Sequence, residues 1–221
     1  MELEVPVGDA GRRRHPDLAA VLLAHGIALA RAGGPDAVSL RDVQRRAGVS
    51  HAAAYRHYAD RDALLAAISR HASAQMAEAI TDAQHQAPLA SATPSARARA
   101  QHVRARFRAT GHAYLTYALT EPGLFRTAFL ADTAAGDPAD PVPEARGSQG
   151  LGPYQLLMQC LNDMVTAGAL PPERRPFSDV AAWAAVHGLA VLLLDGPLRH
   201  LDPTQQAAAV TRLLDIVAAG T

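Results

Sequence analysis

Apolar side chains recur at helical spacing along most of the chain. The first such run extends from Leu18 to Leu29 and ends at Gly33-Gly34-Pro35, a combination that stops helices. Ser39, Ser50 and Asp60 each precede a further apolar run and are typical helix-capping residues. These positions predict two short helices, over about 39–47 and 50–58, and a longer one from residue 60 toward residue 88.

The remaining sequence continues this pattern. We expect a loop over 87–94, a long helix over about 95–119, a short one beginning at Pro122, and helices over about 153–167, 178–194 and 204–218. Residues 132–152 are rich in Gly, Pro and Asp, so we expect them to be the least ordered part of the core sequence. Because no strand pattern is visible, the fold class is predicted to be all-α.

Composition supports a packed protein whose positive charge is local. The chain of 221 residues is 49% hydrophobic and 19% charged, which excludes a disordered polymer. Its net charge is zero, yet arginines outnumber acidic residues over 11–61. The single cysteine, Cys160, excludes an internal disulfide and is expected to be buried and structural. The N-terminus lacks the pattern of a signal peptide, and the apolar run at 189–194 is too short to span a bilayer. We therefore expect a soluble cytoplasmic protein without membrane contact.

The run from Ser39 to Leu65 has the spacing of a helix-turn-helix. Val43 and Ala47 fall on the inner face of the first helix, and Gly48 stands where the turn needs a positive φ. The N-terminal end of the second helix is then placed to meet base edges, and the polar residues that follow are suited to phosphate oxygens. The predicted DNA-contacting residues are Ser39, Arg41, Gln44, Arg45, Ser50, His51, Ala52, Ala53, Tyr55, Arg56, His57 and Arg61.

This stretch resembles the DNA-binding domain of the TetR family over about Asp17 to Ile68. The family signature is an Ala-Gly-Val-Ser corner, a Tyr-x-x-Phe/Tyr pair and a basic residue opening the next helix. Here these are residues 47–50, Tyr55 with Tyr58, and Arg61 in place of the usual lysine. An ordinary helical hairpin is the alternative, but it leaves the local excess of arginine unexplained.

Two departures from that signature bear on specificity. Gln44 stands where alanine is usual, so its amide either points outward or touches DNA. The recognition helix offers only His51 and Arg56 as polar base readers, so contacts of Ala52 and Ala53 with thymine methyls, and DNA shape, are expected to carry part of the readout.

The resemblance also implies a division of the chain. Residues 1–15 form a flexible basic arm ending in Arg12-Arg13-Arg14, which either enters the minor groove or is a solvated tail. Residues 16–62 form a three-helix, helix-turn-helix DNA-binding domain. Residues 63–221 form a larger helical domain for effector binding and dimerisation.

In that larger domain, Trp183 and His187 lie one turn apart and Gly188 follows, a pattern similar to the TetR subgroup named for Trp, His and Gly. Family members bind a small effector among these helices. The candidate ligand-binding residues are Phe107, Tyr114, Phe125, Phe129, Met158, Trp183 and His187. For any single one of them, plain core packing is the favoured interpretation.

The helix over 178–194 is apolar nearly all round, so it needs a core on one side and a partner on the other. The resemblance implies that it pairs with the last helix and their two-fold mates in a homodimer. The predicted interface residues are Val191, Leu194, Val210, Leu213, Leu214 and Val217.

These features predict a DNA-binding transcriptional regulator, a dimeric repressor that a small, largely apolar ligand releases from a palindromic double-stranded operator. The alternative is a small-molecule-binding or scaffold protein of TetR-like fold without operator binding. An enzyme is not expected, because no catalytic residues, metal-ligand spacing or Gly-rich phosphate loop are visible. No cofactor or metal is expected either. The sequence names neither operator nor effector.

Overall fold

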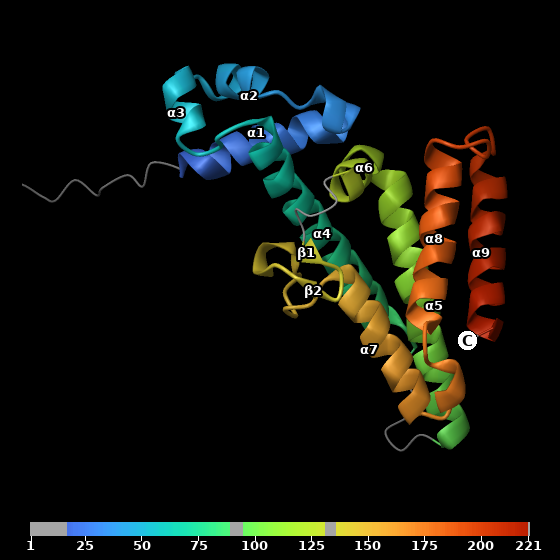
Figure 1. Cartoon of the computed structure of the whole chain (residues 1–221). Coiled ribbons are helices and arrows are strands. Elements are labelled where there is room, and N and C mark those ends of the chain that lie inside the picture. Colours follow the sequence, from blue (N-terminus) through green and yellow to red (C-terminus); the bar gives the residue numbers. More distant parts are fainter. Residues whose placement is uncertain (1–16, 89–94, 131–135, 221) are drawn as a thin grey trace, which may run out of the picture.

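The computed structural model describes residues 17–88, 95–130 and 136–220, and within these ranges the chain is almost entirely helical (Figure 1). The all-α prediction is therefore confirmed. The predicted basic arm at residues 1–15 lies outside the described residues, as does most of the loop expected at 87–94.

Three short helices form the N-terminal head, residues 17–60. They are α1 (Leu18–Gly33), α2 (Leu40–Ala47) and α3 (His51–Tyr55). As predicted, Ser39 and Ser50 cap α2 and α3, each hydroxyl accepting a hydrogen bond from the backbone N–H three residues later. Gly48 between them has φ 67°, the left-handed conformation that the turn requires.

One long helix, α4 (Arg61–Gln86), links the head to the rest of the molecule. Asp60 caps it, because its carboxylate accepts a hydrogen bond from Ala63 N–H at 2.7 Å. Its first turns pack under α1, where a Cβ added to Gly26 would lie 3.0 Å from the side chain of Ile68. The predicted domain boundary at residue 62 falls in the first turn of this unbroken helix, so the division stays a prediction.

The body consists of the helices that surround the lower part of α4. These are α5 (Ala96–Thr120), α6 (Pro122–Leu130), α7 (Pro153–Thr166), α8 (Ser178–Leu194) and α9 (Pro203–Gly220), with short 3-10 turns at Pro35–Ala37, Pro143–Ala145 and Pro172–Arg174. α5 runs through the middle, in contact with α4, α7, α8 and α9. α8 and α9 lie side by side along the outer edge (Figure 1). The predicted helices are all present, with ends that differ by a few residues.

Residues 136–152 correct the prediction of a poorly ordered segment over 132–152, of which residues 132–135 lie outside the described residues. β1 (Gly136–Asp137) pairs antiparallel with β2 (Asp140–Pro141), and a 3-10 turn follows. Each strand is too short to show an alternating pattern, so the sequence carried no strand signal. Ser148 fixes the segment to α4, because its hydroxyl donates to the Glu78 carboxylate at 2.8 Å. The Gly, Pro and Asp residues here build tight turns rather than a loose loop.

Head and body meet where the C-terminal end of α1 abuts α6. A Cβ added to Gly123 would lie 2.1 Å from the Ala30 carbonyl oxygen, so only glycine permits this approach. Beside it, the Arg31 guanidinium and the Glu121 carboxylate form an ion pair at 2.7 Å. We call this contact the head–body junction.

Within the ranges given above, no helix combines the length and apolar character needed to cross a bilayer.

Candidate DNA-binding surface and effector cavity

The recognition helix α3 presents its first residues outward. Ser50, His51 and Ala52 are exposed, Ala53 is half-buried, and Ala54 is fully buried against the head as its small side chain predicts. The His51 imidazole stacks on the Tyr55 ring, with centroids 4.0 Å apart and planes inclined by 19°. This stack restricts the orientation of the one imidazole at the exposed end of α3.

The predicted phosphate contacts surround that end. Tyr55 is 41% exposed, and Arg56 and His57 are exposed beside it. On α2, Arg41 is exposed, and Arg45 is exposed while it forms an ion pair with Asp42 at 3.2 Å. Ser39 is engaged in the cap of α2. Apart from the capping residue Ser39, these side chains are exposed on α2 and α3 or directly after α3, and they are not part of the head's core.

Gln44 and Arg61 are placed differently from the predicted outward contacts. The Gln44 side-chain oxygen is buried and has no hydrogen-bond partner among the described residues, so this end of its amide does not point outward. Arg61 donates hydrogen bonds to the carbonyl oxygens of Val38 at 2.9 Å and Pro35 at 2.7 Å. It therefore holds the turn between α1 and α2, and a contact with DNA stays a prediction.

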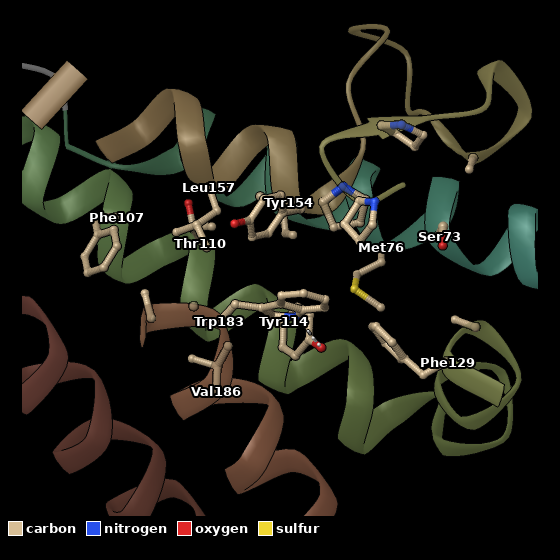
Figure 2. A pocket seen from close by; sticks show the side chains of 18 of the residues that line it. Ser73, Met76, Phe107, Thr110, Tyr114, Phe129, Tyr154, Leu157, Trp183 and Val186 are labelled. Carbon is tan, nitrogen blue, oxygen red and sulfur yellow. Dashed lines mark hydrogen bonds between the residues drawn. The ribbon is translucent and has the colours of Figure 1, made fainter. Parts of the chain in front are cut away.

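A cavity of about 240 Å³ lies in the body, between α4, α5, α7 and α8 (Figure 2). Four of the predicted ligand-binding residues line it, namely Phe107, Tyr114, Phe129 and Trp183. Ser73, Met76 and Ile80 of α4 form one wall, and Pro138 and Pro141 of the β1–β2 hairpin form a roof. A segment expected to be poorly ordered therefore covers part of the cavity.

Three predicted ligand-binding residues lie outside this lining. Phe125 is buried behind it and meets the Tyr114 ring edge-on at 5.7 Å. His187 does not line the cavity but contacts a residue that does, because its Nδ1 lies 2.8 Å from the Tyr114 hydroxyl oxygen. Met158 does not line the cavity, because α7 turns Tyr154 and Leu157 toward it instead.

Burial controls the protonation of the polar groups around the cavity. Desolvation lowers the pKa of His187 below its ordinary value, which favours the neutral imidazole. Desolvation raises the pKa of Tyr114, so its hydroxyl stays protonated at neutral pH. The Trp183 indole N–H also donates to the Tyr114 oxygen, at 3.4 Å. Outside the lining, burial raises the pKa of the Cys160 thiol to about 11, as expected of a structural cysteine.

Most of the predicted dimer-interface residues on α8 and α9 are buried or partly buried within the subunit, and their role in a dimer stays a prediction. Val210 and Leu214 are buried within their own subunit, because the apolar side of α9 packs on α5. Val217 lines the cavity, and Leu194 and Leu213 pack partly buried against the core. Of the predicted set, Val191 is exposed. The large apolar side chains that stand exposed on or next to these helices are Phe177, Val180, Val191, Leu192 and Ile216.

The predicted interface set did not include Phe177, Val180, Leu192 or Ile216, and Phe177 is the most exposed of these four side chains. It precedes α8, outside the helical period, and is 80% exposed. Its φ of 60° is the left-handed conformation, which non-glycine residues rarely adopt. The cavity residues Ser73, Thr110 and Tyr154 were missed because their spacing fits ordinary helix faces equally well.

Comparisons with known proteins agree with this architecture. The model described as "Bacterial regulatory proteins, tetR family" matches residues 22–68, and "Tetracyclin repressor-like, C-terminal domain" matches residues 107–217. The Trp-His-Gly subgroup is not confirmed by these matches. The comparison with curated proteins gives no match.

Several solved structures share the fold. A protein of unknown function from Rhodococcus sp. RHA1 is 27% identical, covers 95% of this chain and 98% of its own, and superposes with a TM-score of 0.70. A regulatory protein in the tetR family from Rhodococcus RHA1 is 19% identical, with coverages of 93% and 97% and a TM-score of 0.57. A TetR variant from Acinetobacter baumannii AYE in complex with minocycline is 18% identical, with coverages of 91% and 94% and a TM-score of 0.55. With a C-terminal family match that spans half of its length and an N-terminal match to the helix-turn-helix, this chain belongs to the TetR family of transcriptional regulators.

Proposed function

We propose that this regulator is a dimeric repressor that binds a palindromic operator in the cytoplasm and leaves it when a small, largely apolar ligand occupies the cavity. The observation that carries the proposal is the course of α4. This helix begins at Arg61 beneath the head, and its Ser73, Met76 and Ile80 form a wall of the cavity. A ligand that moves this wall can reorient the head.

The DNA-binding part rests on the outward face of α2 and α3. The exposed arginines on α2 and directly after α3 can neutralise phosphates beside a major groove, and the exposed Tyr55 hydroxyl can donate a hydrogen bond to a phosphate oxygen. His51 is the polar side chain best placed to reach a base edge, with Ala52 beside it for a thymine methyl.

The proposal of a dimer is based on the exposed face of α8. Val180, Ala184, Val191 and Leu192 stand exposed on this helix, and Gly188 has open space where a Cβ would be. Small residues between larger apolar ones allow two helices to approach closely. A two-fold pairing through α8 and α9 would cover this face and set the two recognition helices about one turn of DNA apart.

The gating part rests on the cavity itself. Its lining is mostly aromatic and aliphatic, and the hairpin covers part of it. The neighbour from Acinetobacter baumannii AYE was solved with minocycline, which supports a ligand site in this fold, although its identity of 18% carries no ligand over to this chain. An effector that favours one head orientation would weaken operator binding by about 1–3 kcal/mol through its differential affinity for the two states.

Selection of bound sites from a random duplex library by the full chain, at a stated salt concentration, tests the operator. We expect a palindrome with half-sites about one helical turn apart. Arg41→Ala and Tyr55→Ala should each lower affinity at least about tenfold, because each loses a phosphate contact. Only Arg41→Ala should also flatten the salt dependence, because it removes a positive charge. Gln101→Ala on the exposed side of α5 is the matched control and should bind as the parent does. Failure to enrich any site would favour a TetR-like binding protein without an operator.

A further inference from the structure

The lining of the cavity, within the described residues, carries no carboxylate, no lysine or arginine and no imidazole. It consists of apolar, aromatic, glycine, serine and threonine side chains throughout the part of the chain that the structure describes. Charged residues on the neighbouring helix faces are engaged elsewhere. Arg106 pairs with Asp163 at 2.9 Å, and Asp179 receives the Tyr154 hydroxyl at 3.0 Å and lies 3.6 Å from Arg175. A ligand charge buried here would have no counter-charge, and such burial is strongly unfavourable.

Aromatic rings form much of the wall that a ligand would meet. Trp183 lies between Tyr154 and Phe129, with ring centroids 5.2 and 6.5 Å from its own (Figure 2). Phe107 lies toward the opposite end, near Leu157 (Figure 2). Pro138, Pro141 and Pro153 border the cavity and have no backbone N–H to donate. Such a wall offers stacking and edge contacts to a flat ring and few donors to a strongly polar molecule.

The hydroxyl groups of the lining differ in how far they are already bonded. Thr110 donates to the Arg106 carbonyl at 3.0 Å and accepts from Gln84 at 2.8 Å, so its hydrogen-bonding capacity is largely used. Tyr154 donates to Asp179, and Tyr114 is held by His187 and Trp183. By contrast, the Ser73 hydroxyl makes no hydrogen bond with any described residue. It lies on α4, near Met76, at the end of the cavity away from Phe107 (Figure 2).

We propose that this cavity selects uncharged aromatic compounds that carry one hydrogen-bonding group, and that the Ser73 hydroxyl receives that group. The inference rests on the proposed effector site and adds the class of its ligand. The ring stacks among Trp183, Tyr154 and Phe129, and its polar substituent reaches α4. A cavity of about 240 Å³ suits a compound of roughly two fused or linked rings, smaller than a typical drug.

The chain provides its own reporter, because Trp183 is its single tryptophan and lines the cavity. We would titrate the full-length protein with biphenyl, 4-hydroxybiphenyl and biphenyl-4-carboxylate, following the emission of Trp183 excited at its red edge. These probes share one skeleton and differ in a single substituent. We expect 4-hydroxybiphenyl to bind about 3- to 10-fold more tightly than biphenyl, as one net hydrogen bond provides. We expect the carboxylate to bind at least about 100-fold more weakly than 4-hydroxybiphenyl.

Ser73→Ala tests the polar contact. It should abolish the preference for 4-hydroxybiphenyl over biphenyl and leave the affinity for biphenyl within about twofold, because only one hydrogen bond is lost. Thr204→Ala removes a hydroxyl from an exposed position of α9 and should preserve the preference. Tight binding of the carboxylate would overturn the exclusion of charge. A preference that survives in Ser73→Ala would overturn the role of Ser73.

The same probes separate this inference from the proposed function. If they bind in the expected order but leave operator affinity unchanged, the ligand class stands and gating fails. If the protein binds its operator and a charged compound releases it while the neutral probes do not bind, the proposed repressor stands and the ligand class is wrong.

Discussion

Arg61 shows that one side chain of the TetR signature also holds the head together. Its guanidinium donates to two carbonyl oxygens in the turn between α1 and α2, and it approaches the Asp36 carboxylate to 3.9 Å. The lysine usual at this position in the family has a single ammonium and cannot present two fixed N–H groups in the same geometry. The basic residue therefore has a structural reason to be arginine here.

Arg61→Ala is expected to lower the free energy of unfolding by about 1–2 kcal/mol, because two carbonyl oxygens lose a charged donor. Denaturant unfolding of the full chain measures this. Arg46→Ala removes an exposed arginine of α2 and should change stability by less than about 0.5 kcal/mol. Equal stability of the two variants, with operator binding lost only in Arg61→Ala, would show instead that Arg61 acts on DNA.

Two half-buried imidazoles predict a pH dependence of stability. Desolvation lowers the pKa of His187 and of His71 in the folded state, whereas an unfolded histidine titrates near 6.5. Below about pH 6.5 the unfolded chain therefore binds more protons, and stability falls as the pH falls. Above about pH 7.5 both states are neutral and this contribution vanishes. Unfolding free energies at pH 7.5 and 5.0 should differ, and His71→Gln should reduce the difference. No difference between the two pH values would contradict the burial of both imidazoles.

At the scale of elements, local signals were sufficient where a helix begins at a capping side chain. Ser39, Ser50 and Asp60 mark the starts of α2, α3 and α4, and the structure places a cap at each. The β1–β2 hairpin could not be predicted, because strands of two residues produce no periodicity. Its position over the cavity is a tertiary property, set by contacts such as Ser148 with Glu78.

The sequence predicts which face of a helix a residue occupies, but not what that face contacts, so the roles of single residues could be predicted only in part. The helical period placed Phe107, Tyr114 and Trp183 on inner faces, and they line the cavity. It could not decide between Tyr154 and Met158 on α7, which lie one turn apart but have different surroundings. Likewise, Val210 and Leu214 belong to an apolar stripe of α9, and the stripe alone does not say whether a neighbouring helix or a second subunit covers it.

The exposed face of α8 predicts how the proposed dimer would respond to substitution. Ala184→Arg places a charge at the centre of this face, so we expect a monomer at micromolar concentration in sedimentation velocity. Gly188→Ala should leave unfolding of the isolated protomer unchanged or slightly favour the fold, while it weakens dimerisation by adding a methyl where two helices approach. Gln101→Arg on α5 is the control. A dimer that persists in both α8 variants would place the interface elsewhere.

At the scale of the whole molecule, two routes join the cavity to the head. One is α4, which forms a cavity wall and then packs beneath α1. The other passes through α6, where Phe129 lines the cavity and Gly123 abuts the last carbonyls of α1. Arg126 of α6 also forms hydrogen bonds of 2.7–3.0 Å with Asp195 at the end of α8, which ties this route to the proposed dimer face. In the proposed gating, a rotation of the head would therefore have to involve both α4 and α6.

Gly123→Ala tests whether the head–body junction sets the orientation of the head. The new methyl would overlap the Ala30 carbonyl oxygen, which is backbone and cannot move without its helix. We expect α1 and α6 to separate, at a cost of about 1–3 kcal/mol in the free energy of unfolding. Operator affinity should fall further than stability explains, because both heads of the dimer would lose their spacing. Binding of the selected operator at a temperature where the variant is fully folded measures that second effect.

A single isolated half-site provides the control, because one head needs no spacing and should bind it as the parent does. If the variant lost affinity equally for the half-site and the full palindrome, the junction would support the head's fold and not its orientation.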